Sequence, residues 1–156
     1  MVNFNTIGGL AVTYLAKYST WGEDFWEDLV APTLGVPLLT ETWQNGKGRL
    51  ASFCTQDGAA WDVENILSVS LGQGAAFKET QDHSKWAVAE DHSRWAVRNA
   101  SEPRSAAEEA SVAPWACVGD LNMQSGQQSR AGGAMCVNDA NFHTAYYNLV
   151  TSVEEC

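Results

Sequence analysis

The amino-acid sequence predicts an α+β layered domain in which a mixed β-sheet is flanked by helices. Two observations support this prediction. Short segments in which apolar and polar residues alternate recur along the chain, and two longer segments place apolar residues at helical spacing. With 156 residues and 45% hydrophobic content, the chain is long enough to form one domain with a substantial core, over residues 1–156.

The expected strands begin near the amino terminus. Residues 3–18 have strand composition interrupted by Gly8 and Gly9, and residues 36–43 and 63–71 continue the pattern. Three further strands complete the predicted sheet: residues 83–88 (HSKWAV), 115–121 (WACVGDL) and 133–137 (GAMCV). In the first of these, alternation lets the side chains of Trp86 and Val88 enter a core.

Two helices are expected outside the sheet. The segment Trp21–Val30 carries apolar residues on one side and acidic residues on the other, and Pro32 and Gly35 end it. The segment Asn138–Val153 is the second, with four side chains directed toward the core and His143 on the surface. The four are Phe142, Tyr146, Leu149 and Val150.

A duplicated motif carries the chemical signal. Asp82-His83-Ser84-Lys85-Trp86 is followed nine residues later by a near copy, residues 91–95 (DHSRW). On a strand, residues i and i+2 point to the same side, so the His83 imidazole and the Lys85 ammonium can meet one phosphate group. A solvated surface strand is the alternative. A metal site is disfavoured, because Lys85 would repel a cation beside His83 and no zinc-like ligand spacing is present.

Charge limits the partners. The net charge is −10 and the pI is near 4.5, which opposes binding of a polyanion at neutral pH. The objection weakens in acid, where the protein approaches neutrality and its three histidines gain protons. No apolar run approaches the roughly 20 residues of a membrane span, so no membrane partner is expected. No charged segment followed by an apolar one opens the sequence, so no signal peptide is visible.

Cysteine usage favours an oxidising compartment. The four cysteines contain no C-x-x-C pair, and an even count fits two disulfides, for which the sequence alone allows three pairings. Asn99-Ala100-Ser101 is a glycosylation sequon. The polar, Ala/Ser/Glu-rich residues 99–112 predict a mobile loop.

Several segments in order closely resemble the carboxy-terminal half of the deoxyribonuclease II family, which is related to the phospholipase D superfamily. They are GLAVTYLAKYSTWGEDFWEDLVAPTLG, WDVENILSVSLG, DHSKWAV, PWACVGDLNMQSGQQSRAGGAMC and the final Cys156. The resemblance implies a phospholipase D-like layered fold. It also implies the disulfides Cys117–Cys136 and Cys54–Cys156 and a secreted or lysosomal location.

The resemblance further implies hydrolysis of DNA phosphodiester bonds without a metal or other cofactor. One histidine attacks phosphorus and forms a phosphohistidine, a second protonates the leaving oxygen, and lysines stabilise the phosphate oxygens. Asn122 of GDLN matches a phosphate-contacting asparagine of the family. One departure is that the family's acidic pair after this motif is Gln127-Gln128 here.

Of the two copies of the motif, we expect the first to be catalytic, with His83 and Lys85. The second carries Arg94 instead of lysine, and a planar guanidinium does not replace an ammonium at a tight phosphate site without cost. Ser84, His92 and Arg94 are predicted to be auxiliary substrate contacts.

The chain has the length of one half of a two-motif relative. If the two copies formed a hairpin, His83 and His92 would be about 13 Å apart along the strands, too far for one phosphate. We therefore expect a homodimer, or a separate chain that supplies the other half. A catalytically reduced nucleic-acid-binding or toxin-like module, and an acidic interaction protein, remain the alternative functions.

Overall fold

The computed structural model describes residues 1–90 and 113–156. Three predictions therefore lie outside the described residues: the contacts made by His92 and Arg94, the sequon at Asn99, and the loop over residues 99–112. The described residues contain no helix that is long and apolar enough to cross a membrane.

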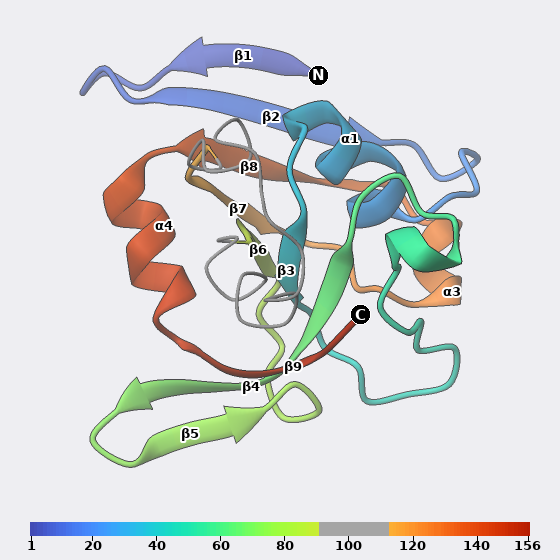
Figure 1. Ribbon diagram of the computed structural model, residues 1–156. Coiled ribbons are helices and arrows are strands. Elements are labelled where there is room, and N and C mark those ends of the chain that lie inside the picture. Colours follow the sequence, from blue (N-terminus) through green and yellow to red (C-terminus); the bar gives the residue numbers. More distant parts are fainter. Residues whose placement is uncertain (91–112) are drawn as a thin grey trace, which may run out of the picture.

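A nine-stranded sheet forms the centre of the described structure (Figure 1). Its order is β1-β2-β8-β7-β6-β3-β4-β5, and β9 pairs with β4 beside this path. Among the strands of residues 1–90 and 113–156, β3 and β4 are the one parallel pair, so the sheet is mixed, as predicted. The strands are β1 Val2–Asn5, β2 Ala11–Lys17, β3 Leu38–Glu41, β4 Val63–Gly72, β5 Ala75–Lys78, β6 Trp86–Ala89, β7 Trp115–Gly119, β8 Gly132–Asn138 and β9 Val150–Glu154.

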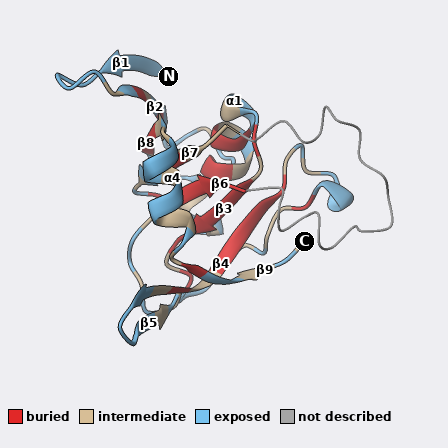
Figure 2. Cartoon of the chain, turned by 60° about the vertical axis from the view of Figure 1, so that its left-hand side comes forward, coloured by how far each residue is buried: buried red, intermediate tan, exposed pale blue. Residues whose placement is uncertain are grey.

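Helices cover both faces of the sheet. They are η1 Trp26–Val30, α1 Ala31–Leu34, η2 Thr55–Asp57, α3 Ser125–Gln128 and α4 Ala140–Tyr147. One buried cluster joins η1 and α1 to one face, with Trp26 at its centre. A second cluster on the other face includes Trp86 and Val88, against which Tyr146 of α4 packs. Both faces of β3, β6 and the first half of β4 are therefore buried, as Figure 2 shows.

The first predicted helix is displaced toward the carboxyl terminus. Instead of covering Trp21–Val30, the helical segment begins at Trp26, because the Asp24 carboxylate accepts hydrogen bonds from the backbone N–H groups of Trp26 and Glu27 at 2.8 and 3.1 Å. It then continues through Pro32, which is the second residue of α1, so Pro32 does not end the helical segment as predicted. Gly35, with φ +69°, ends it.

The prediction of the second helix is correct for its first part and wrong for its last part. Asp139 caps α4, but the helix ends at Tyr147, and Val150–Glu154 forms strand β9 against β4. The β-branched residues of this segment favour a strand, and its pairing with β4 supplies the partner. Phe142, predicted to face the core, is 47% exposed.

Both disulfides implied by the resemblance are present. Cys117 and Cys136 are direct cross-strand partners on β7 and β8. Cys54–Cys156 joins residues 102 apart in sequence and fastens the end of the chain beside η2. The two disulfides fit a secreted or lysosomal protein.

Candidate functional site

The His83–Lys85 segment lies immediately before strand β6, not on it. The strand begins at Trp86, so the prediction that places both residues on a strand is wrong. The cause is local: the Asp82 carboxylate accepts hydrogen bonds from the backbone N–H and the hydroxyl of Ser84, both at 2.8 Å, which turns the chain. The ladder nevertheless reaches Lys85, whose carbonyl oxygen accepts from the Gly119 N–H at 2.8 Å.

The exposed His83 ring is stacked on the indole of Trp43. The ring centroids are 4.4 Å apart and the planes are inclined by 25°. The Lys85 ammonium donates a hydrogen bond to the backbone carbonyl of His83. The structure therefore brings the two residues of the motif together, although the ammonium is bound to the main chain and the imidazole is held by an aromatic ring.

Asn122 reaches the same tryptophan from the loop after β7. Its side-chain oxygen accepts a hydrogen bond from the Trp43 backbone N–H at 3.2 Å. Beside it, the Met123 N–H donates to the Thr42 hydroxyl at 3.3 Å. Asn122 is only 7% exposed, and the contact with Trp43 engages its side-chain oxygen. The N–H₂ group of the same amide is a donor of the kind that binds a phosphate oxygen.

Glu41 is a buried carboxylate that the sequence analysis missed. It lies at the end of β3, opposite Trp86 in the ladder, with no exposed surface. Neither carboxylate oxygen has a hydrogen-bond partner in the described part of the chain. Burial and, to a smaller extent, the negative charges of Asp82 and Glu79 raise the pKa of Glu41 to about 8, against the opposing charge of Lys85. The signal in the sequence was a charged residue inside the apolar strand LLTE.

Lys85 lies among these carboxylates. Burial lowers its pKa, whereas the negative charges of Asp82, Glu41 and Asp120 oppose that effect. The Lys85 ammonium can still bind a phosphate oxygen by a charge-assisted hydrogen bond, and protonation of the neighbouring carboxylates in acid would reduce their repulsion of the phosphate.

The segment after GDLN is fixed by a lysine. Lys17 on β2 donates from its ammonium to the carbonyl oxygens of Gln127, Gln128 and Arg130 at 2.9, 2.7 and 2.9 Å. These carbonyls lie at the end of α3, where an ammonium is favourable. The two glutamines therefore hold the loop through their main chain, and no carboxylate is supplied from their positions.

Two other predicted residues have local partners. The Ser84 hydroxyl is bound to Asp82, as described above. His143, predicted to lie on the helix surface, is half-buried, and its Nε2 atom lies 2.8 Å from the Ala89 carbonyl oxygen. Ala89 follows His83 by six residues, or up to about 20 Å along an extended chain. His143 therefore serves to join α4 to β6. The described residues hold no group of three or more His, Cys, Asp or Glu side chains arranged to bind a metal ion.

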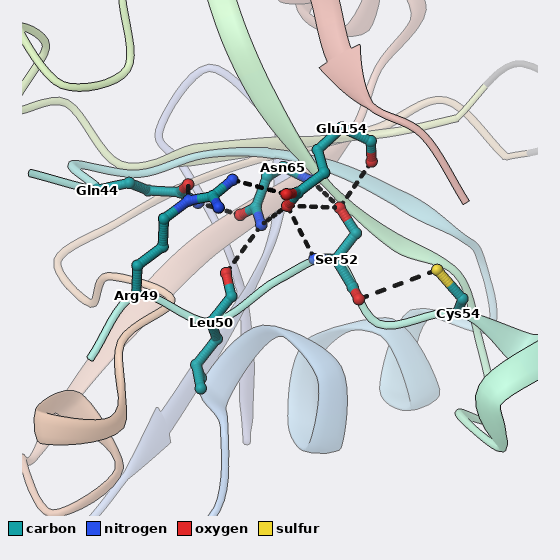
Figure 3. A network of polar contacts seen from close by, with 7 residues as sticks. All are labelled: Gln44, Arg49, Leu50, Ser52, Cys54, Asn65 and Glu154. Carbon is teal, nitrogen blue, oxygen red and sulfur yellow. Dashed lines mark hydrogen bonds and ion pairs between the residues drawn. The ribbon is translucent and has the colours of Figure 1, made fainter. Parts of the chain in front are cut away.

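A second polar network adjoins the site and is fully paired (Figure 3). Glu154 of β9 forms an ion pair with Arg49 at 2.9 Å and accepts hydrogen bonds from Asn65 and Ser52 at 2.9 and 3.0 Å. Gln44, next to Trp43, donates to Asn65 and accepts from Arg49. Burial raises the pKa of Glu154, but the hydrogen bonds from Asn65, Arg49 and Ser52 outweigh it and lower the pKa. This network binds the 44–54 loop to β4 and β9.

An imidazole and an amide that both contact Trp43, with an ammonium bound beside the imidazole, are groups suited to binding and attacking phosphate esters. Comparison with known proteins gives the family. The family model for deoxyribonuclease II matches residues 1–156. The chain belongs to the deoxyribonuclease II family.

The relatives are longer proteins. The chain is 36% identical over 155 residues to Plancitoxin-1 of Acanthaster planci, covering 99% of this chain and 37% of the relative. It is 34% identical over 140 residues to a putative deoxyribonuclease-2 of Burkholderia thailandensis, covering 88% of this chain and 33% of the relative. It is 30% identical over 150 residues to deoxyribonuclease-2-alpha of Mus musculus, covering 95% and 36%. The chain spans about a third of the length of these relatives.

Proposed function

We propose that this chain carries one half of the active site of an acid endodeoxyribonuclease that cleaves DNA phosphodiester bonds through a phosphohistidine and without a metal ion. The observation that carries the proposal is that His83 and Asn122 both contact Trp43, while the Lys85 ammonium is bound to the main chain of His83. His83 is exposed and accessible to a substrate, whereas Lys85 and Asn122 are more buried and offer donors to it.

The roles follow from the chemistry of each group. A neutral His83 nitrogen attacks phosphorus, a P–N bond forms, and the P–O bond to the leaving nucleoside oxygen breaks as that oxygen takes a proton from a second imidazole. The second imidazole then removes a proton from water, whose oxygen attacks phosphorus and releases His83. Lys85 and the Asn122 amide stabilise the non-bridging oxygens, on which negative charge develops.

The second imidazole has to come from elsewhere. Among the described residues the other histidine is His143, which is bound to Ala89. We infer that a second copy of the chain, or a separate half-domain chain, supplies it, so that a two-fold axis places two copies of His83 at one phosphate. His92 and Arg94 would act as auxiliary phosphate contacts.

Acid conditions fit this proposal. The net charge of −10 repels DNA at neutral pH, and protonation of carboxylates reduces that repulsion. The mechanism also requires one protonated imidazole to donate to the leaving oxygen while its partner is neutral. A secreted or lysosomal location, which the two disulfides support, would supply an oxidising environment.

Nicking of supercoiled plasmid at pH 5 in excess EDTA tests the proposal. We expect cleavage that EDTA leaves unchanged and that decreases toward pH 7.5. Light scattering under the same conditions should give the mass of a dimer. A monomer that cleaves would contradict the two-fold site, and a dimer that does not cleave at any pH would contradict the nuclease activity.

A catalytically reduced DNA-binding module is the second candidate. The observation in its favour is that Gln127 and Gln128 supply no carboxylate beside the site, so a group that orients a catalytic histidine is missing. DNA binding at pH 5 that depends on Lys85, without nicking by the dimer or by a mixture with a homologous half-domain, would favour this function.

A further inference from the structure

Trp43 is the residue through which the parts of the candidate site meet. Its ring stacks on His83, and its backbone N–H donates to Asn122. Its indole N–H donates to the Thr80 carbonyl oxygen at 3.2 Å. Thr80 precedes His83 by three residues, so the indole contacts both ends of the turn that carries the histidine.

The indole itself is held firmly. Trp43 follows β3 by two residues, and the side chain of its neighbour Thr42 accepts a hydrogen bond from Met123. On the other side, Gln44 is bound to Asn65 and Arg49. Both neighbours are buried, whereas the Trp43 side chain is half-buried and keeps one face for contact. The position of Trp43 is therefore fixed by the contacts of the residues before and after it.

His83 lacks comparable support of its own. It is exposed, lies outside the ladder of β6, and no hydrogen bond to either of its ring nitrogens exists among the described residues. Without the stack, its two side-chain torsions would sample several rotamers. A nucleophile must approach phosphorus within a narrow range of positions, and a displacement of about 1 Å can reduce the rate about 100-fold.

We propose that Trp43 is the positioning residue of His83: its indole face sets the plane of the imidazole, and its main chain fixes Asn122 relative to that plane. The proposal rests on the proposed function for its effect on catalysis, whereas the stack itself can be tested without activity. It predicts that an aromatic ring at position 43 is required and that the indole N–H is of secondary importance.

Nuclear magnetic resonance of the histidine ring protons tests the stack in the intact chain. His83→Gln identifies the His83 signal among the three histidines. We expect an upfield ring-current shift of that signal and cross-relaxation with the Trp43 ring protons in the unmodified chain. Trp43→Leu should abolish the upfield shift and Trp43→Phe should retain part of it. Absence of both signals from the unmodified chain would overturn the proposal.

Plasmid nicking at pH 5 tests positioning. Trp43→Leu should reduce kcat about 100-fold with little change in KM, because a misplaced nucleophile affects the chemical step. Trp43→Phe should restore kcat to within a few-fold of the unmodified chain. Trp115→Leu is the matched control, since it removes another half-buried indole that packs on the core and should leave kcat and the His83 signal unchanged.

Each other outcome overturns the proposal in a distinct way. A raised KM with unchanged kcat would make Trp43 a DNA-stacking residue. If Trp43→Leu, Trp43→Phe and Trp115→Leu all kept the kcat of the unmodified chain, the stack would have no role in catalysis. If Trp43→Leu fails to fold, the comparison of Trp43→Phe with the unmodified chain decides, because loss of the His83 ring-current shift with full activity would contradict positioning. If the unmodified chain is inactive, the proposed function fails, while the resonance measurements still decide whether Trp43 holds His83.

Discussion

Two polar regions meet at residues 43 and 44, and they treat buried charge in opposite ways. Around Glu154, ionised and polar groups are paired with one another, and the pKa of that carboxylate is lowered. Around Lys85, Glu41 is fully buried with both oxygens unpaired in the described structure, and its pKa is raised. The first arrangement stabilises the fold. The second arrangement costs stability whenever Glu41 is ionised.

The cost of the second arrangement can be bounded. A buried polar group without a partner typically costs about 1–3 kcal/mol, and an ionised one costs more. Glu41 avoids most of that cost by holding a proton at acid pH. The network around Glu154 removes the cost by pairing, and the Cys54–Cys156 bond closes beside it. Substitutions around Lys85 should therefore affect mainly activity, and substitutions around Glu154 should affect mainly stability.

The largest expected effect is on activity. His83→Ala should abolish plasmid cleavage at pH 5 because the covalent step is lost. Lys85→Ala should reduce kcat about 100-fold to 1000-fold, as is typical when a transition-state charge partner is removed. His92→Ala should be far milder. Thermal midpoints of the three variants should stay near that of the unmodified chain, and an inactive His92→Ala beside an active His83→Ala would reverse the assignment of the copies.

The largest expected effect on stability lies in the other region. Replacing Cys54 and Cys156 by serine opens a loop of 102 residues, which the chain-entropy model values at about 5 kcal/mol. Replacing Cys117 and Cys136, which are 19 residues apart, should cost about 3 kcal/mol in the same model. Urea midpoints at pH 5 measure both. If removal of Cys117–Cys136 lowered the unfolding free energy more than removal of Cys54–Cys156, contacts in the native state would determine the effect of each disulfide more than loop closure does.

Sequence patterns predicted the sheet better than they predicted its ends. Strands such as β4 and β8 have local apolar patterns, so their existence was evident. Strand β9 was assigned to a helix because its strand character depends on β4, more than 80 residues away. The displaced start of the first helix depended on one side chain, Asp24, whose capping hydrogen bonds do not show in apolar periodicity.

The candidate site was only partly predictable for the same reason. The motif identified His83, Lys85 and Asn122, because those residue types stand at family positions. Trp43 carries no motif, and its contact with Asn122 spans 79 residues. Glu41 looked like an ordinary charged residue until the register placed it opposite Trp86. Residues that act through tertiary contacts leave little trace in local spacing.

The pH dependence of stability sharpens the comparison further. The pKa of Glu41 is raised from 4.5 to about 8, so the native state holds a proton that the unfolded state releases above pH 4.5. Stability should therefore fall as pH rises from 4.5 to about 8, by about 2–4 kcal/mol for this group. Asp24 and Glu27, with pKa values raised by burial to about 6 and about 7, act in the same direction.

Glu41→Gln is the matched test of that slope. Glutamine keeps the shape and cannot ionise, so the difference in unfolding free energy between pH 5 and pH 8 should shrink relative to the unmodified chain. Urea denaturation at both pH values measures it. An unchanged slope would mean that Glu41 exchanges no proton on unfolding in this range.

The smallest expected effects come from the exposed edge of the paired network. The Arg49 side chain is 35% exposed, so Arg49→Met should cost no more than about 1 kcal/mol, as is usual for surface ion pairs. Glu154→Gln should cost more, about 1–3 kcal/mol, because its acceptors for Ser52 and Asn65 are altered as well. The pH dependence of stability should change in opposite directions in Glu154→Gln and in Glu41→Gln. The pKa of Glu154 is lowered, so its contribution is present above about pH 4.5 and is lost as pH falls below that value. Urea midpoints between pH 3 and pH 6 should therefore fall less steeply toward acid in Glu154→Gln than in the unmodified chain, and an equal or steeper fall would remove the contrast between the paired and the unpaired carboxylate.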